Sequence, residues 1–398
     1  MNAIRHHGPI TRLKVASLTG MAPSAVTGIV GEMIQEGIVL EAGWEGSTGG
    51  RKPAVLALNS EAGYIFAVRI QHGTIAAALL DLAGNTLETR WHRLEKVRPE
   101  AIIANISSSL AMLAANTGID RQKIIRCGVA VPGLINYAEG MVERASNLAW
   151  NRVPLGVMLS RRLGGIPVRI ENISNAAAFG EMVYGTGGGC ANLIYVNLSV
   201  GIGAGIIIGR RLFGGSEGYA GEIGGAPIPL TAGLTGGKPV RYNTFEELCG
   251  VRAIMGQVWA QIPDEVFREV GLPKSRIDID EILLAPLINI PEIRRIIREA
   301  GCLIGVKVAE LINLFNPEMV ILGGELTTAG NVLLDAINQT VEMNTLAEMR
   351  RSVKIVFSSM RKDPPLMGAY GLVLEDFFNS GDWLRTRPGV AAQPSKGL

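Results

Sequence analysis

The chain has 398 residues, 47% of them hydrophobic, and a formal net charge of +2 at pH 7. This length and composition predict a globular protein of two or three domains, and the small charge excludes nucleic-acid binding through a generally basic chain. The four cysteines show no CxxC spacing, which argues against a disulfide framework and against a zinc site. No secretory signal or long uncharged apolar run is present, so we expect a soluble cytoplasmic protein with no membrane partner.

Residues 1–59 are predicted to form a separate unit that contains two short helices. Thr11 is placed to cap the first helix and Gly20 to end it. Pro23 suits the first turn of the second helix, whose apolar residues recur at the spacing of one buried face. Two helices around a tight turn are typical of a helix-turn-helix, whose second helix enters the major groove of DNA.

The second helix and the segment that follows it carry the candidate DNA contacts. The strand-like "IVLEAG" and "PAVLAL" flank the glycine-rich "WEGSTGGRK", which predicts a wing whose cations reach phosphates or a narrow minor groove. We assign DNA binding to Ser24, Ala25, Thr27, Gly28, Arg51 and Lys52. A winged helix that contacts a protein and not DNA is the alternative.

The remainder of the chain predicts two related α/β lobes. A strand pair followed by alternating helices and strands occurs twice, which is typical of two such lobes with a cleft between them. We place the first lobe at 60–185, completed by a helix at 364–378, and the second lobe at 186–363. Residues 381–398 are expected to be a disordered tail.

The segment "GIGAG", Gly201 to Gly205, lies between apolar runs. A dinucleotide fingerprint requires a strand before it and a helix after it, whereas this segment continues as a strand. The glycines therefore form either a structural turn or a loop whose backbone N–H groups face a phosphate.

The ordered motifs "VPGLI", "ENISNAAAFGE", "VNLSVGIGAGIIIGRRLFGG", "AGEIGG" and "NPEMVILGGEL" resemble those of the ROK family of repressors, open reading frames and kinases. The resemblance is to its repressor branch, which includes N-acetylglucosamine and xylose repressors. It implies an N-terminal winged helix-turn-helix followed by a two-lobe actin-like, sugar-kinase fold of the ribonuclease H-like type. It also implies a homodimer or homotetramer.

This sequence departs from the family's kinases at three places. The resemblance puts Ile173 where the kinases have the aspartate that takes the proton from the attacking hydroxyl. It puts Arg69 at the acidic residue of the first phosphate loop, and Gly225 at the histidine of the zinc segment, without the cysteine cluster that follows there. We therefore expect no catalytic residue, no zinc and no ATP.

Other positions that hold sugar hydroxyls in the family retain polar residues. The resemblance assigns sugar binding to Asn147, Asn172, Glu222 and Glu246, whose side chains offer directional donors and acceptors. The sequence thus predicts a DNA-binding transcriptional regulator, a repressor, with an inactive sugar-kinase-like part that senses a sugar or sugar derivative. The alternatives are an ATP-dependent sugar kinase that retains a DNA-binding domain, and a regulator controlled by a protein partner.

Overall fold

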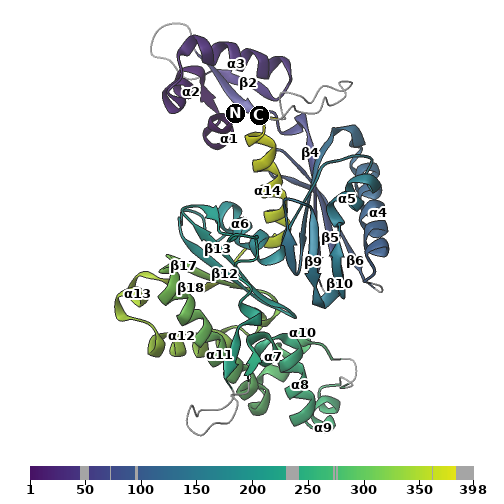
Figure 1. Cartoon of the computed structure of the whole chain (residues 1–398), viewed down its shortest axis with the longest axis vertical. Helices are drawn as coiled ribbons and strands as arrows, with labels where there is room; N and C mark the ends of the chain where they lie inside the picture. Colours follow the sequence, from purple (N-terminus) through teal and green to yellow (C-terminus); the bar gives the residue numbers. More distant parts are fainter. Residues whose placement is uncertain are drawn as a thin grey trace.

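The computed structural model describes residues 1–44, 53–71, 73–94, 97–229, 242–271, 274, 277–360 and 362–381. Two candidate DNA contacts, Arg51 and Lys52, and the tail beyond residue 381 lie outside these described residues. Figure 1 shows a small N-terminal part at one end of the molecule, a first sheet next to it and a second sheet farther away. The last helix, α14 (Pro364–Asn379), returns toward the N-terminal part.

The N-terminal unit, residues 1–58, combines short helices with a small antiparallel sheet of strand order β1-β3-β2. Its elements are α1 (Asn2–His7), β1 (Ile10–Thr11), α2 (Arg12–Thr19), α3 (Pro23–Gln35), β2 (Val39–Trp44) and β3 (Ala54–Leu58). The predicted caps are confirmed, because the Thr11 hydroxyl accepts a hydrogen bond from the Lys14 N–H and Gly20 ends α2 with a left-handed φ of 69°. Apolar residues of α3 bury one face, as their spacing predicts.

The first sheet has the strand order β11-β7-β4-β5-β6. Its strands are β4 (Tyr64–Gln71), β5 (Thr74–Asp81), β6 (Thr86–Arg93), β7 (Ile124–Val131) and β11 (Val168–Asn172). The strands β4, β5 and β6 are antiparallel, whereas β7 and β11 run parallel to β4. Beside this sheet lie α4 (Pro99–Thr117), α5 (Leu155–Arg162), β8 (Leu134–Asn136), β9 (Met141–Ala145) and β10 (Trp150–Val153).

The second sheet repeats this arrangement with the strand order β14-β13-β12-β17-β18. Its strands are β12 (Leu193–Leu198), β13 (Ile202–Ile208), β14 (Arg211–Leu212), β17 (Met319–Gly323) and β18 (Lys354–Phe357). Again an antiparallel hairpin is extended by two parallel strands, as the repeated sequence pattern predicts. The helices around this sheet are α7 (Phe245–Cys249), α8 (Val251–Gln261), α9 (Asp264–Glu269), α10 (Ile279–Ile282), α11 (Pro291–Phe315), α12 (Asn331–Asn344) and α13 (Ala347–Ser352), with a short hairpin of β15 (Pro227–Pro229) and β16 (Tyr242–Thr244).

Two buried helices, α6 (Ile173–Tyr184) and α14 (Pro364–Asn379), connect the parts of the molecule (Figure 1). They pack closely because both carry small residues at their contact, and a Cβ added at Gly368 would lie 1.6 Å from the Ala176 carbonyl oxygen. One continuous apolar cluster joins Ile4 of the N-terminal unit, Ile65 of β4, and Tyr370 and Phe377 of α14. The N-terminal unit therefore shares its core with the first sheet. No single helix in the described part of the chain has the length and apolar character to cross a membrane.

Candidate functional site

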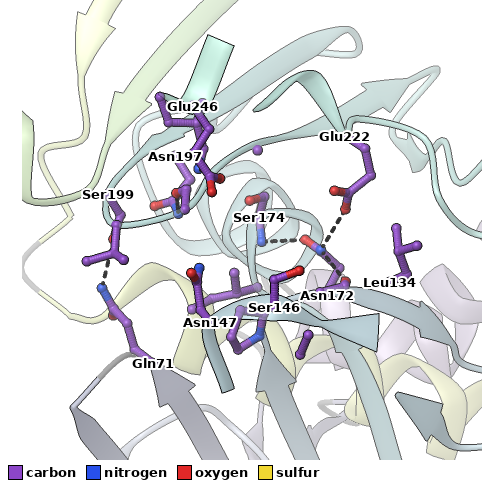
Figure 2. A pocket seen from close by; sticks show the side chains of 18 of the residues that line it. Gln71, Leu134, Ser146, Asn147, Asn172, Ser174, Asn197, Ser199, Glu222 and Glu246 are labelled. Atoms are coloured by element: carbon purple, nitrogen blue, oxygen red, sulfur yellow. Dashed lines mark hydrogen bonds between the residues drawn. The ribbon is translucent and has the colours of Figure 1, made fainter. Parts of the chain in front are cut away.

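A polar pocket lies between the two sheets, at the N-terminus of α6. Its cavity measures about 140 Å³, and residues of both sheets line it (Figure 2). The polar side chains around it are Gln71, Arg144, Ser146, Asn147, Asn172, Ser174, Asn197, Ser199, Glu222 and Glu246. The structure thus brings together all the residues that the sequence analysis assigned to sugar binding.

Asn172 ends β11 and caps α6. Its Oδ1 accepts hydrogen bonds from the backbone N–H groups of Ser174 at 2.7 Å and Asn175 at 3.3 Å, and its Nδ2 donates to the Gly133 carbonyl at 2.9 Å. The same Nδ2 lies 3.5 Å from Oε1 of Glu222. The side chain is therefore fixed by the protein before any ligand binds, which holds one wall of the pocket in place.

The two glutamates approach the pocket from the second sheet's side (Figure 2). Glu246 lies on α7, where its Oε2 accepts a hydrogen bond from the Ile202 N–H at 2.9 Å. The pKa of Glu222 is raised, mainly because its own carboxylate is desolvated. The negative charge of Glu246 raises this pKa further, and the positive charge of Arg144 lowers it. Two carboxylates and one guanidinium at one cavity offer both acceptors and donors to a hydroxylated ligand.

The glycines of "GIGAG" allow the β12–β13 hairpin to approach the pocket and α6. A Cβ added at Gly201 would lie 2.8 Å from Nδ2 of Asn147, which stands in the short helix Ser146–Leu148. Added at Gly205, it would lie 2.3 Å from the Ser174 carbonyl oxygen and 2.5 Å from Cβ of Ala178. These contacts leave no room for a side chain at Gly201 in the turn or at Gly205 within β13, so close packing accounts for both glycines.

The sequence analysis singled out Ile173, Arg69 and Gly225 as departures from the kinase pattern, and the first two have partners within the protein. Ile173 opens α6, is 7% exposed, and joins an apolar cluster with Ala130 and Ala176. The Arg69 Nε lies 2.8 Å from Oδ2 of Asp363 in an ion pair. Gly225 ends a short helix near the pocket. Within the described ranges, no three histidine, cysteine, aspartate or glutamate side chains are grouped as metal ligands.

Sequence reasoning missed several lining residues, among them Gln71, Arg144, Asn197 and Ser199. A usable signal existed for two of them. Asn197 and Ser199 stand at the carboxyl end of the buried strand β12, directly before the glycine turn, where a polar side chain faces a cleft more often than a core. Gln71 gave no comparable signal, because the segment that begins at Arg69 resembles an altered phosphate loop and does not by itself indicate a pocket residue.

Two α/β sheets of matching strand order, with a polar pocket between them, define a sugar-kinase-like fold. The match of the ROK family's sequence profile to residues 65–376 gives the particular family. The chain belongs to the ROK family.

Relatives and solved structures agree with this assignment. The chain is 28% identical to the putative xylose repressor of Caldicellulosiruptor sp. strain Rt8B.4, covering 96% of both chains. It is 25% identical to the DNA-binding transcriptional dual regulator NagC of Escherichia coli K12, covering 94% of this chain and 91% of that protein.

Among solved structures, a ROK family transcriptional regulator, described as a homolog of the E. coli MLC protein, matches with a TM-score of 0.79 at 24% identity, covering 96% of this chain and 97% of that one. A ROK family glucokinase from Streptomyces griseus, in complex with glucose and AMPPNP, matches with a TM-score of 0.66 at 28% identity, covering 78% of this chain and 99% of the glucokinase. Because the regulator covers 96% of this chain, its match includes the N-terminal unit as well as the two sheets and their helices.

Proposed function

We propose that this protein is a DNA-binding transcriptional repressor whose sugar-kinase-like body binds a sugar or sugar derivative without phosphorylating it. The observation that carries the proposal is the polar pocket between the sheets, in a body that shares a core with the N-terminal unit. The names of the relatives, a xylose repressor and NagC, support the same function.

The N-terminal unit would act as a winged helix-turn-helix of residues 1–59. The axes of α2 and α3 cross at 116°, within the range typical of this motif. On α3 the candidate DNA contacts Ser24, Ala25, Thr27 and Gly28 are all exposed. Arg51 and Lys52 would complete the interface from the wing. Residues 60–185 with 364–378 would form the first lobe, and 186–363 the second.

The pocket would hold its ligand through hydroxyl groups. Asn147, Glu222 and Glu246 offer a donor and acceptors on different sides of the cavity, which suits a polyol ring (Figure 2). Asn172 would mainly set the position of α6 and offer its remaining hydrogen-bonding capacity.

The body would lack kinase activity for two reasons. Ile173 carries no group that accepts a proton, and Arg69 is bound to Asp363 at the place where the kinases have an acidic residue. The likeness to a glucokinase keeps phosphotransfer as the second candidate. A coupled assay over hexoses and amino sugars with ATP separates the two, because turnover above background would overturn the proposal.

Regulation would be allosteric. A sugar that binds better to one separation of the lobes shifts the protein toward it and changes the spacing of two N-terminal units in a homodimer or homotetramer on cytoplasmic operator DNA. The changed spacing would weaken operator binding, and by linkage operator DNA would lower sugar affinity by the same factor.

The test of sugar binding is a thermal-shift screen over a sugar library that includes xylose and N-acetylglucosamine. A specific sugar is expected to raise the melting temperature of the full-length protein, and to do so less in a Glu246→Ala variant than in an Asn116→Ala variant. Asn116 is a suitable control because it is an exposed residue of α4. No shift with any sugar would refute the sensor, and pull-down from lysate would then test the protein-partner alternative.

The test of DNA binding is selection of genomic fragments by the full-length protein, followed by gel-shift titration. Ser24→Glu is expected to abolish binding to a selected fragment, because it places a carboxylate on the groove-facing turn of α3. A glutamate in the first turn of a helix favours the helix, so this loss would not arise from unfolding. Ser108→Glu, at an exposed position of α4, is the matched control. Equal DNA affinity of both variants would contradict the assignment of α3.

A further inference from the structure

The altered segment that begins at Arg69 forms a chain of polar contacts across the molecule. Nε2 of Gln71 donates to Oε1 of Glu325 at 2.5 Å and to Oγ of Ser199 at 3.3 Å. Gln71 ends β4 in the first sheet, whereas Glu325 and Ser199 follow strands of the second sheet. These hydrogen bonds therefore exist only at one separation of the two sheets.

The contacts continue from Gln71 to the last helix. Oε1 of Gln71 accepts a hydrogen bond from Nη1 of Arg69, and Nε of Arg69 pairs with Oδ2 of Asp363. The side chains of this pair are only 10% and 12% exposed, so their attraction is weakly screened. Oδ1 of Asp363 accepts from the Leu366 N–H and caps α14. The guanidinium of Arg69 is also held 5.2 Å from the centre of the Trp91 ring.

The far end of α14 contacts the N-terminal unit. A helix of this length carries a displacement over about 24 Å. At that end Nδ2 of Asn2 donates to Oδ1 of Asn379 at 2.9 Å, and the Arg5 guanidinium lies 5.3 Å from the centre of the Phe378 ring. Ile4 packs in the same apolar cluster as Phe377. A shift of the first turn of α14 therefore reaches α1 through a rigid, buried element.

We propose that Gln71 and Arg69 are positioning residues that couple the separation of the two sheets to the placement of α14 and the N-terminal unit. We call Gln71, Arg69, Asp363 and Glu325 the clasp. Gln71 also lines the pocket, so a molecule bound there changes the contacts that hold the clasp closed. This coupling rests on the proposed function, since it gives the route by which pocket occupancy reaches the DNA-binding unit.

The test uses the full-length protein alone, with neither sugar nor DNA, and follows amide hydrogen exchange. Loss of one such hydrogen bond is expected to speed local opening about fivefold. In Gln71→Ala, exchange should therefore rise about fivefold in α1 and in the last turn of α14, as well as near Ser199. Exchange in α4, which contributes no residue to the clasp, should not change. Gln122→Ala, an exposed residue of the same type, should match the wild type throughout.

A reciprocal exchange of side chains separates coupling from general damage. Gln71→Glu places two carboxylates against each other and should raise exchange in α1. Adding Glu325→Gln exchanges the two side chains, so that the amide at position 325 donates to the carboxylate at position 71. That carboxylate also still accepts from Arg69, and hydrogen exchange in α1 should return to wild-type rates. Increased exchange confined to the surroundings of Ser199 and Glu325, increased exchange in α4, or failure of the double variant to restore α1 would each overturn the proposal. If no sugar raised the melting temperature but the double variant restored exchange in α1, the proposed sugar sensing would be refuted, whereas the coupling between the sheets and α1 would be supported.

Discussion

Asn172 is predicted to support the pocket through stability as much as through ligand contact. In Asn172→Ala, α6 loses its cap, which costs about 1 kcal/mol. The Gly133 carbonyl loses the hydrogen bond from Nδ2, at 2.9 Å in the wild type, for about 1 kcal/mol more. The free energy of unfolding should therefore fall by about 2 kcal/mol, even with no ligand present.

Urea denaturation followed by circular dichroism measures this change. Asn172→Ser keeps an oxygen that can cap α6 but loses the donor to Gly133, so it should recover about half of the loss. Asn116→Ala, which removes one exposed hydrogen bond to Glu88, should change the stability by no more than about 0.5 kcal/mol. If Asn172→Ala unfolded at the wild-type urea concentration, the capping role would be refuted and Asn172 would be a ligand contact alone.

Three further predictions concern the glycine Gly205 of β13, the charge of Glu222 and the residue Ile173. Gly205→Ala should destabilise the protein by about 1–3 kcal/mol, because the added Cβ would meet the Ser174 carbonyl. Gly256→Ala, at an open position on α8, should instead stabilise it by up to about 1 kcal/mol. If the urea midpoints of the two variants shifted in the same direction, this explanation would be contradicted. Since the pKa of Glu222 is raised, the folded state holds its proton more tightly than the unfolded chain, and stability falls as pH rises from the ordinary glutamate pKa through the raised one. Glu222→Gln should therefore raise the melting temperature at pH 7.5 and not at pH 4. An equal change at both pH values would show that the charge of the Glu222 carboxylate is not what destabilises the folded state. Ile173→Asp should give no phosphorylation of hexoses in a coupled ATP assay, because the first phosphate loop is also altered; measurable turnover would show that only the base was missing.

Local signals in the sequence predicted the elements that depend on neighbouring residues. Thr11 and Gly20 bound α2 because capping involves backbone groups only a few residues away. The two sheets followed from a strand pattern that occurs twice. The residues grouped in the pocket came from the resemblance to a family, since spacing alone does not bring Asn147 and Glu246 together.

Contacts between distant segments were not predictable in this way. Gln71 and Glu325 are 254 positions apart, and their hydrogen bond depends on how two sheets are set against each other. Asn172 was assigned as a sugar contact, and its capping of α6 became evident only from the exact end of β11. A single sequence identifies which side chains are polar, whereas the three-dimensional packing decides which polar groups are already paired.

The shared core of the N-terminal unit and α14 has a consequence for synthesis. Asn2 and Asn379 are 377 positions apart, yet their side chains are hydrogen-bonded. A nascent chain that has not yet released Phe377 and Phe378 from the ribosome cannot close the apolar cluster around Ile4. The N-terminal unit is therefore synthesised before α14, and a product truncated ahead of Phe377 would lack the apolar side chains against which Ile4 packs.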